Sequence, residues 1–290
     1  MALPNFIVIG VAKAGTTSLY RYLDEHPQIY MCPLKGTNYF GYEDARSWEW
    51  TDEGEPPLLR HFHVRSLEEY EQAFAGARDE IAIGEVSPQY FRSPTAAQRI
   101  RECIPDARLI ASLRNPVDRA FSGYLMRTRR GEVVRSADDD LTADASHVKE
   151  GLYYRRLKRY FDLFPREQMK IILFDDFARD AAAVVSDLFG FLGVDTTFVP
   201  DTGPKYNRAN VPRSRRLNRV LYHPAAVRTA KTLLPAGAHG LARRARQRNL
   251  KPPPTLPPEL RARLLDVYRD DILRVEELIG RDLSAWLREP

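Results

Sequence analysis

Short apolar runs alternate with amphipathic stretches along the first two thirds of the chain. The apolar runs predict strands at FIVIG (6–10), IAIGE (81–85), ARLIASL (107–113) and MKIILF (169–174). Runs of this length without polar interruption are typical of strands that are buried on both faces. Strands that alternate with helices form βαβ units, and such units build a parallel sheet with helices on both sides.

Helical spacing of apolar residues follows most of these strands. The predicted helices cover residues 16–25, 67–76, 94–103, 116–126, 153–164 and 176–193. Ser66 and Glu69 have the spacing of a capping box at the start of the second helix. Segments 41–66 and 130–147 show neither the helical nor the strand spacing of apolar residues. We therefore expect an irregular excursion over 41–66 and a loop over 130–147.

The pattern changes near residue 200. A basic loop and further helices follow, and a proline-rich hinge at 251–258 precedes a last long helix. We expect one domain over 1–290, with a core over about 1–200 and a helical C-terminal extension over about 201–290. The expected fold class is α/β, with a central parallel sheet flanked by helices in a three-layer sandwich of the P-loop nucleotide-kinase-like type.

Composition and charge narrow the classes of function. Hydrophobic residues make up 43% of the chain and charged residues 29%, as in an ordinary globular protein. The net charge of +5 favours anionic ligands, while the arginine-rich stretches are explained by solvated helix faces and need no nucleic acid. Two cysteines provide no disulfide framework, and no His/Cys spacing indicates zinc. With no leader and no apolar stretch of roughly 20 residues, we expect a cytoplasmic protein without a membrane span; the oligomeric state is not indicated.

The segment VIGVAKAGTT (8–17) predicts an anion-binding loop between a strand and a helix. Backbone N–H groups and the helix dipole converge on an anion in such a turn. The P-loop pattern has a lysine directly after its second glycine, whereas Lys13 lies inside this loop, ahead of Gly15. No predicted strand ends in an obvious Mg²⁺-binding aspartate. We therefore expect a phosphate cradle that needs no metal, and the alternative is an incidental glycine turn.

A second candidate site is the segment LRNPVDRAFSGY (113–124). Arg114 follows a predicted strand, and Ser122 lies about two turns along the next helix. The carboxyl edge of a parallel sheet is where open α/β folds bind charged cofactors, and guanidinium with hydroxyl suits a phosphate. The alternative is an ion pair between Arg114 and Asp118, with Ser122 packed in its helix. Together the two sites would hold a nucleotide with two separate anionic groups.

Four segments also resemble a known family. KAGTTSLYRYLDEHPQI, GEVSPQYF, LRNPVDRAFSGY and YRDDILRVEELIGRDLSAWL are similar to sulfotransferases that use 3′-phosphoadenylyl sulfate (PAPS), particularly the heparan-sulfate-type and bacterial branch. The similarity runs in order along nearly the whole chain. It implies transfer of a sulfuryl group from PAPS to a hydroxyl or amine of a small-molecule, lipid or glycan acceptor, with release of adenosine 3′,5′-bisphosphate and no metal.

The resemblance also implies roles for individual residues. Lys13 would neutralise the charge that develops on the leaving oxygen, and Arg114 with Ser122 would bind the 3′-phosphate. The 5′-phosphosulfate would be held by Lys13, Ala14, Gly15, Thr16, Thr17 and Ser18. Further contributors to the 3′-phosphate site would be Arg213 or Arg215. The acceptor site would be lined by Lys35, Tyr39, Phe40 and Tyr153, for each of which surface exposure or core packing is the alternative.

The segment PLKGTNYF (33–40) departs from the family pattern. The resemblance implies a glutamate as general base where this chain has Gly36, and glycine cannot accept a proton. Candidate replacements are Glu43, Asp44, His61, His63 and Glu85. Imidazole titrates near neutral pH, which favours a histidine, whereas Glu85 could instead anchor a neighbouring loop. The remaining alternatives are an acidic acceptor that needs no base, a catalytically impaired nucleotide-binding relative, and a P-loop kinase of a small molecule.

Overall fold

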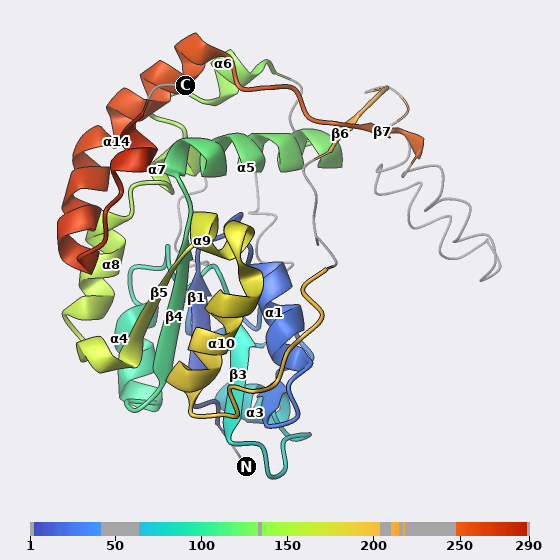
Figure 1. Ribbon diagram of the computed structural model, residues 1–290, viewed down its shortest axis with the longest axis vertical. Helices are drawn as coiled ribbons and strands as arrows, with labels where there is room; N and C mark the ends of the chain where they lie inside the picture. The colour runs from blue at the N-terminus through green and yellow to red at the C-terminus, as the bar shows by residue number, and fades with distance from the viewer. Residues whose placement is uncertain are drawn as a thin grey trace. The chain divides into compact units, whose positions relative to one another are not determined.

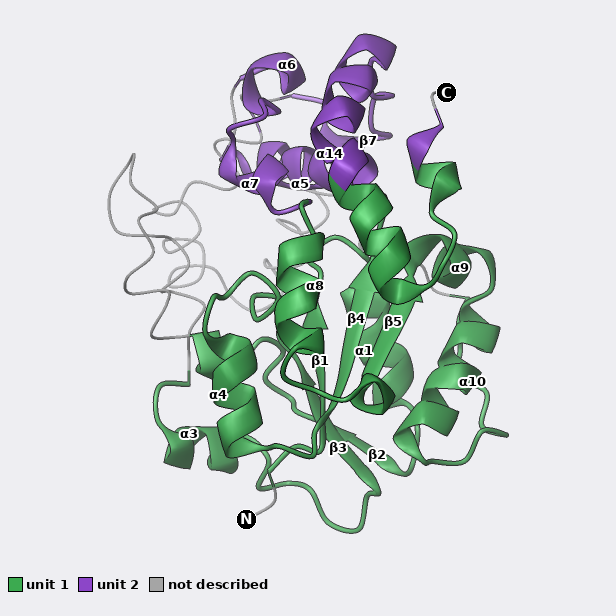
Figure 2. Cartoon of the chain, turned by 90° about the vertical axis from the view of Figure 1, so that its left-hand side faces the viewer, with its two compact units in different colours: residues 1–115, 152–206, 271–286 green, residues 116–151, 207–270, 287–290 purple. Residues whose placement is uncertain are grey.

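A computed structural model of the chain describes residues 3–41, 64–132, 135–203, 210–214, 217 and 248–288 (Figure 1). The chain divides into two compact units (Figure 2). The first unit comprises residues 1–115, 152–206 and 271–286, and the second comprises residues 116–151, 207–270 and 287–290. The single domain expected over 1–290 stays a prediction.

The first unit is built on a five-stranded sheet in which every pairing is parallel. Its strands are β1 (Phe6–Gly10), β2 (Ile29–Met31), β3 (Ala82–Val86), β4 (Arg108–Leu113) and β5 (Met169–Leu173). The strand order is β2-β3-β1-β4-β5, so β1 lies at the centre. All five residues of β1 are buried, which explains why its sequence is a continuous apolar run rather than an alternating one.

Helices cover both faces of this sheet (Figure 1). They are α1 (Thr16–Asp24), α3 (Leu67–Gln72), α4 (Ala96–Cys103), α8 (Tyr154–Phe161), α9 (Phe174–Arg179) and α10 (Ala181–Leu192). On one face, Val8 and Ile110 of the sheet join Leu23 of α1 and Leu188 of α10 in one buried cluster. On the other face lie α4 and α8, and the Tyr160 hydroxyl of α8 donates to the carbonyl of Tyr90 at 2.8 Å. The expected three-layer α/β class is confirmed.

The second unit is mainly helical. It contains α5 (Pro116–Arg130), α6 (Ala137–Asp140), α7 (Ser146–Lys149), and most of α14 (Pro258–Ile279). A short antiparallel pair, β6 (Val211–Pro212) and β7 (Leu250–Lys251), completes its regular structure in the described residues. Within this unit Arg261 of α14 pairs with Asp118 of α5 at 2.5 Å. Asp118 thus has Arg261 as one partner, and its pairing with Arg114 stays an open alternative.

Three sequence predictions need correction. The strand β2 was missed because only three of its residues pair, too few for a period to show. Segment 130–147 was expected to be a loop, but it contains α6 and α7; Ser136 caps α6 by accepting from the amide of Asp139 at 3.2 Å. The single helix expected over 176–193 is two helices, because Asp180 has extended backbone angles and caps the second one.

The capping box ahead of α3 is confirmed. The amide of Glu69 donates to the Ser66 hydroxyl at 3.2 Å. The Glu69 carboxylate in turn accepts from the amide of Arg65 at 2.7 Å, one residue earlier than the usual partner. Sequence spacing was sufficient here because both partners are local.

Candidate active site

The loop between β1 and α1 has the backbone of an anion cradle. Lys13 has φ +74° and Gly15 has φ +85°, so two residues take left-handed angles within three positions. The first helical hydrogen bond runs from the amide of Leu19 to the carbonyl of Gly15 at 3.1 Å. The amides of Thr16, Thr17 and Ser18 consequently have no acceptor within the helix, and they lie at its positive end.

Gly15 is required by this geometry. Its backbone angles are unfavourable for any residue with a side chain, and a Cβ atom there would lie 3.2 Å from the rings of Phe174 and Phe177. Lys13 adopts a similar angle without this freedom, at a cost of roughly 1–2 kcal/mol. Strain of this kind persists where the surrounding structure holds the residue in place, which is common at functional sites.

The loop is held from β4 and from the residue after it. The amide of Val11 donates to the carbonyl of Ser112 at 2.8 Å, and the Ser112 hydroxyl donates to the carbonyl of Ala14 at 2.6 Å. Arg114 donates from Nη1 to the carbonyl of Lys13 at 3.2 Å. The amide of Ala14 likewise donates within the loop, to the carbonyl of Val11 at 3.3 Å. A bound anion would therefore be met by the amides of Thr16, Thr17 and Ser18 at the start of α1.

Lys35 reaches the same helix start from a different part of the chain. Its ammonium donates to the Thr17 hydroxyl at 2.5 Å and lies 6.0 Å from the centre of the Tyr20 ring. The residue as a whole is exposed, but its charged end is partly withdrawn from water among these groups. This desolvation, with a smaller contribution from Arg21, lowers the pKa of Lys35 to about 8. The described side-chain contacts of Lys35 lie at the start of α1 beside the phosphate loop, and its predicted role in acceptor binding stays a prediction.

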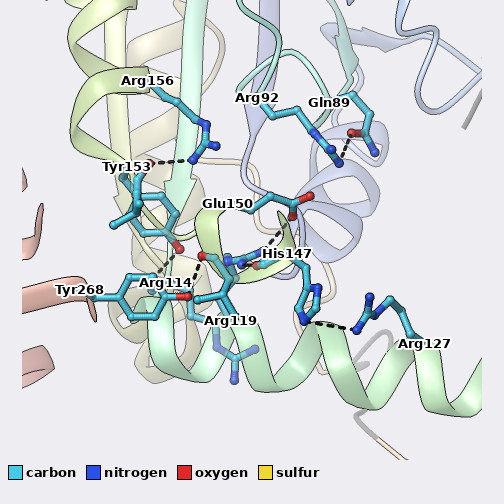
Figure 3. Close-up of polar contacts among 12 residues, drawn as sticks. Gln89, Arg92, Arg114, Arg119, Arg127, His147, Glu150, Tyr153, Arg156 and Tyr268 are labelled. Atoms are coloured by element: carbon cyan, nitrogen blue, oxygen red, sulfur yellow. Dashed lines mark hydrogen bonds and ion pairs between the residues drawn. The ribbon is translucent and has the colours of Figure 1, made fainter. Parts of the chain in front are cut away.

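Arg114 and Tyr153 also lie together in the first unit (Figure 3). The Tyr153 hydroxyl donates to the carbonyl of Arg114 at 2.9 Å, and the guanidinium of Arg114 lies 4.6 Å from the centre of the Phe174 ring. Tyr153 is 1% exposed and its amide donates to Asp271 at 2.6 Å. The contacts of Tyr153 thus orient Arg114, and its predicted role in acceptor binding stays a prediction.

The other residues predicted for the 3′-phosphate belong to the second unit. Ser122 is buried on α5, and the exposed Arg213 donates from Nε to the carbonyl of Leu250 at 3.0 Å. Arg215 lies outside the described residues. Nearby on α5, Arg119 pairs with Glu150 at 3.1 Å (Figure 3). Since Arg114 and Ser122 lie in different units, their shared phosphate stays a prediction.

Glu85 is the best-described candidate for the general base. It is fully buried on β3, and its carboxylate accepts hydrogen bonds from four hydroxyls. Their distances are 2.5 Å from Thr37, 2.7 Å from Ser87, 2.7 Å from Tyr70 and 2.9 Å from Tyr90. Burial raises the pKa of Glu85 above its ordinary value, and the four donors oppose that rise. The contacts favour the anchoring role that the sequence left open for Glu85 over proton transfer, and those from Thr37 and Tyr70 could not be inferred from the sequence.

The segment around Gly36 is sharply kinked. Gly36 has φ +81° and Asn38 has φ +54° on either side of the fully buried Thr37. Tyr39 stacks on Tyr70 at 4.7 Å, and Phe40 is 1% exposed. Phe40 is therefore part of the core, while Tyr39 is half-buried and its role in acceptor binding stays a prediction. The other base candidates, Glu43, Asp44, His61 and His63, lie outside the described residues.

Two kinds of feature are absent from the described residues. No group of three metal-ligating side chains occurs among them. None of the helices placed in the structure has the length and apolar character needed to cross a membrane.

A loop of this kind after the central strand of a parallel sheet is typical of nucleotide-binding α/β proteins. Residues 4–198 match the sulfotransferase family. The chain also resembles a sulfotransferase of known structure from Alicyclobacillus acidocaldarius, with 34% identity and a TM-score of 0.76 over 99% of this chain and 100% of that one. The chain therefore belongs to the sulfotransferase family, and it is an enzyme of the sulfotransferase class.

Curated relatives include larger proteins. The chain is 27% identical to the mouse bifunctional heparan sulfate N-deacetylase/N-sulfotransferase 4, with 99% of this chain and 31% of that protein covered. It is 28% identical to the human heparan sulfate glucosamine 3-O-sulfotransferase 6 over 66% of this chain and 52% of that protein. The chain thus spans between about a third and a half of the length of these two relatives.

Proposed function

We propose that the chain transfers a sulfuryl group from PAPS to a hydroxyl or amine of a small-molecule, lipid or glycan acceptor and releases adenosine 3′,5′-bisphosphate. The observation that carries this proposal is the left-handed turn at Lys13 and Gly15, which opens directly into α1. The residues present fit a bound phosphosulfate: an amide-lined helix start, hydroxyls at Thr16 and Thr17, and two lysines.

The loop and Lys35 would act mainly by fixed positive charge. Sulfuryl transfer, like phosphoryl transfer, depends on in-line positioning and on stabilising charge that develops on the leaving oxygen. Lys13 lies within the loop and the Lys35 ammonium contacts Thr17, so the loop itself and a separate segment would each supply one positive charge to the bound group. No residue of the loop has to move a proton for this step.

Arg114 would bind the 3′-phosphate, with Ser122 and either Arg213 or Arg215 as further contributors. A guanidinium held by the Phe174 ring and by the carbonyl of Lys13 has a fixed direction, which suits charge-assisted hydrogen bonds to a phosphate. Because the same arginine supports the loop, occupancy of one anion site would stiffen the other.

The acceptor's proton needs a base outside the 33–40 segment. His61 and His63 are the proposed candidates, since the contacts of Glu85 are already satisfied by four hydroxyls. The two heparan sulfate relatives support a glycan among the possible acceptors. Cytoplasmic location, bacterial origin and independence of metal remain predictions.

The experiment is turnover of PAPS with a panel of phenol, alcohol, amine and glycan acceptors, followed by release of adenosine 3′,5′-bisphosphate. Lys13→Ala should lower kcat by about 10²- to 10³-fold, because a preorganised charge at the leaving oxygen is removed. The control is Lys149→Ala, which removes one lysine from α7 rather than from the loop. It should leave kcat within twofold of the parent chain. Bisphosphate release that is equal in Lys13→Ala and the parent chain contradicts the proposal, and Mg²⁺-dependent ATP turnover would favour the kinase alternative.

A further inference from the structure

Three consecutive backbone amides face the hydroxyl groups around Glu85. The amide of Asn38 donates to the Ser87 hydroxyl at 3.2 Å, and the amide of Phe40 donates to the Tyr90 hydroxyl at 3.4 Å. The amide of Tyr39 donates more weakly, to the Thr37 hydroxyl at 3.5 Å. Each of these three hydroxyls also contacts the Glu85 carboxylate, at 2.9 Å or less.

This arrangement gives each of the three hydroxyls an amide donor and an acceptor. A hydroxyl has a single proton, so one that accepts from an amide can give its proton only to another acceptor. The carboxylate is an acceptor for Ser87, Thr37 and Tyr90, and the hydroxyls of Thr37 and Tyr90 also lie 3.0 Å apart, where either can donate to the other. The fourth donor, the Tyr70 hydroxyl, contacts the carboxylate at 2.7 Å, and none of the described amides of residues 38–40 donates to it. A carboxylate offers about four lone-pair sites, which the four hydroxyls fill.

The carboxylate thus holds the backbone of 38–40 through intermediary hydroxyls. The held segment begins three residues after Lys35, and Gly36, one of the two residues between them, has a left-handed angle. The far end of Lys35 contacts Thr17 at the start of α1. A change in the segment's backbone would therefore displace the lysine from the phosphate loop.

We propose that Glu85 is a positioning residue that, through the hydroxyls of Thr37, Ser87 and Tyr90, fixes the 37–40 backbone and thereby places the Lys35 ammonium on the phosphate loop. The effect on catalysis rests on the proposed function, whereas the effect on the backbone does not. Glu85 does not touch the donor or the acceptor in this role, and it exchanges no proton with either.

The first test measures the backbone and needs no substrate. Amide hydrogen exchange of Asn38, Tyr39 and Phe40 should accelerate at least tenfold in Glu85→Gln, because an amide side chain has too few lone pairs for four hydroxyls and its NH₂ group must itself donate. Exchange in β1 and β4 should stay within twofold of the parent chain. Unchanged exchange over 38–40 overturns the hydroxyl relay, whether or not the chain proves to be a sulfotransferase.

Two tyrosines provide a matched pair of controls that alter less than Glu85→Gln does. Tyr70→Phe and Tyr90→Phe each remove one buried hydroxyl from the same carboxylate oxygen. Only the Tyr90 hydroxyl also accepts a backbone amide, that of Phe40. Tyr90→Phe should accelerate exchange at Phe40 and lower kcat, and Tyr70→Phe should do both to a smaller extent. Equal effects of the two variants overturn the proposal even if Glu85→Gln fails to fold.

The link to Lys35 is tested by a double-mutant cycle on kcat. Lys35→Ala and Glu85→Gln should each lower kcat about tenfold or more, and the double variant should fall no further than Lys35→Ala alone within twofold. A purely structural role of Glu85 would make the two losses multiply, and that outcome contradicts positioning through Lys35. Absence of turnover in the parent chain would refute the proposed function, and the exchange experiment would still decide the relay.

Discussion

Two lysines belong to one helix start, Lys13 by its place in the loop and Lys35 by its contact with Thr17, although they are separated by 22 positions in the sequence. The first is held by its own strained backbone, and the second by contact with Thr17. The lysine of the usual P-loop pattern follows the second glycine, and here no lysine occupies that position. Charge at the cradle therefore comes from within the loop and from a neighbouring segment.

The lowered pKa of Lys35 predicts a pH dependence. Below pH 8 its ammonium is charged, and the charge is lost as the pH rises through about 8. The parent chain should therefore lose kcat/KM for PAPS progressively above pH 8, because the free enzyme loses one cation at the loop. Lys35→Arg keeps its charge throughout this range and should lack that limb. A pH profile that is the same in both proteins contradicts the assignment.

The contribution of Lys35 to stability should depend on pH in the opposite sense to its contribution to kcat/KM. The folded pKa of Lys35, about 8, lies below its ordinary value of 10.5, so between these values the unfolded chain binds more protons than the folded chain. The contribution of Lys35 to the free energy of unfolding therefore increases with pH across this interval. Urea unfolding of the parent chain and of Lys35→Met at pH 7 and pH 10 should show this difference.

At the scale of elements, sequence patterns predicted what depends on local periodicity. The central strands, the loop at 10–15 and the capping box before α3 are all local features, and the structure contains them. The edge strand β2 is too short for a period to show. The full set of donors around Glu85 could not be predicted because Thr37 and Tyr70, unlike Ser87 and Tyr90, are distant in the sequence and become neighbours only after folding.

The Gly36 backbone predicts that restoring a glutamate will not restore a base. With φ +81°, any side chain there costs roughly 1–2 kcal/mol, although the space is open and the nearest atom to a Cβ would lie 3.5 Å away. Gly36→Ala and Gly36→Glu should therefore lose similar free energy of unfolding by urea denaturation. Turnover of aryl acceptors should rise in neither. A gain of tenfold or more in Gly36→Glu alone would show that the position still serves a base.

At the scale of the whole molecule, the predicted nucleotide site draws on residues far apart in the chain. The loop, Lys35 and Arg114 belong to the first unit, and Ser122 and Arg213 to the second. The order of strands brings β1 and β4 together at the sheet centre, which explains why two motifs about 100 residues apart contact each other. Sequence spacing alone identified both motifs, and the contact between Arg114 and Lys13 required the structure.

The most direct measurement of the central claim is calorimetric titration with adenosine 3′,5′-bisphosphate and with AMP. The account predicts that the parent chain binds the bisphosphate at least tenfold more tightly, since charge-assisted hydrogen bonds to a phosphate contribute about 1.5–3 kcal/mol. Arg114→Ala should abolish this preference. Arg108→Ala, at the other end of β4, should preserve it. Equal affinities in the parent chain, or a preference that survives in Arg114→Ala, would contradict the account.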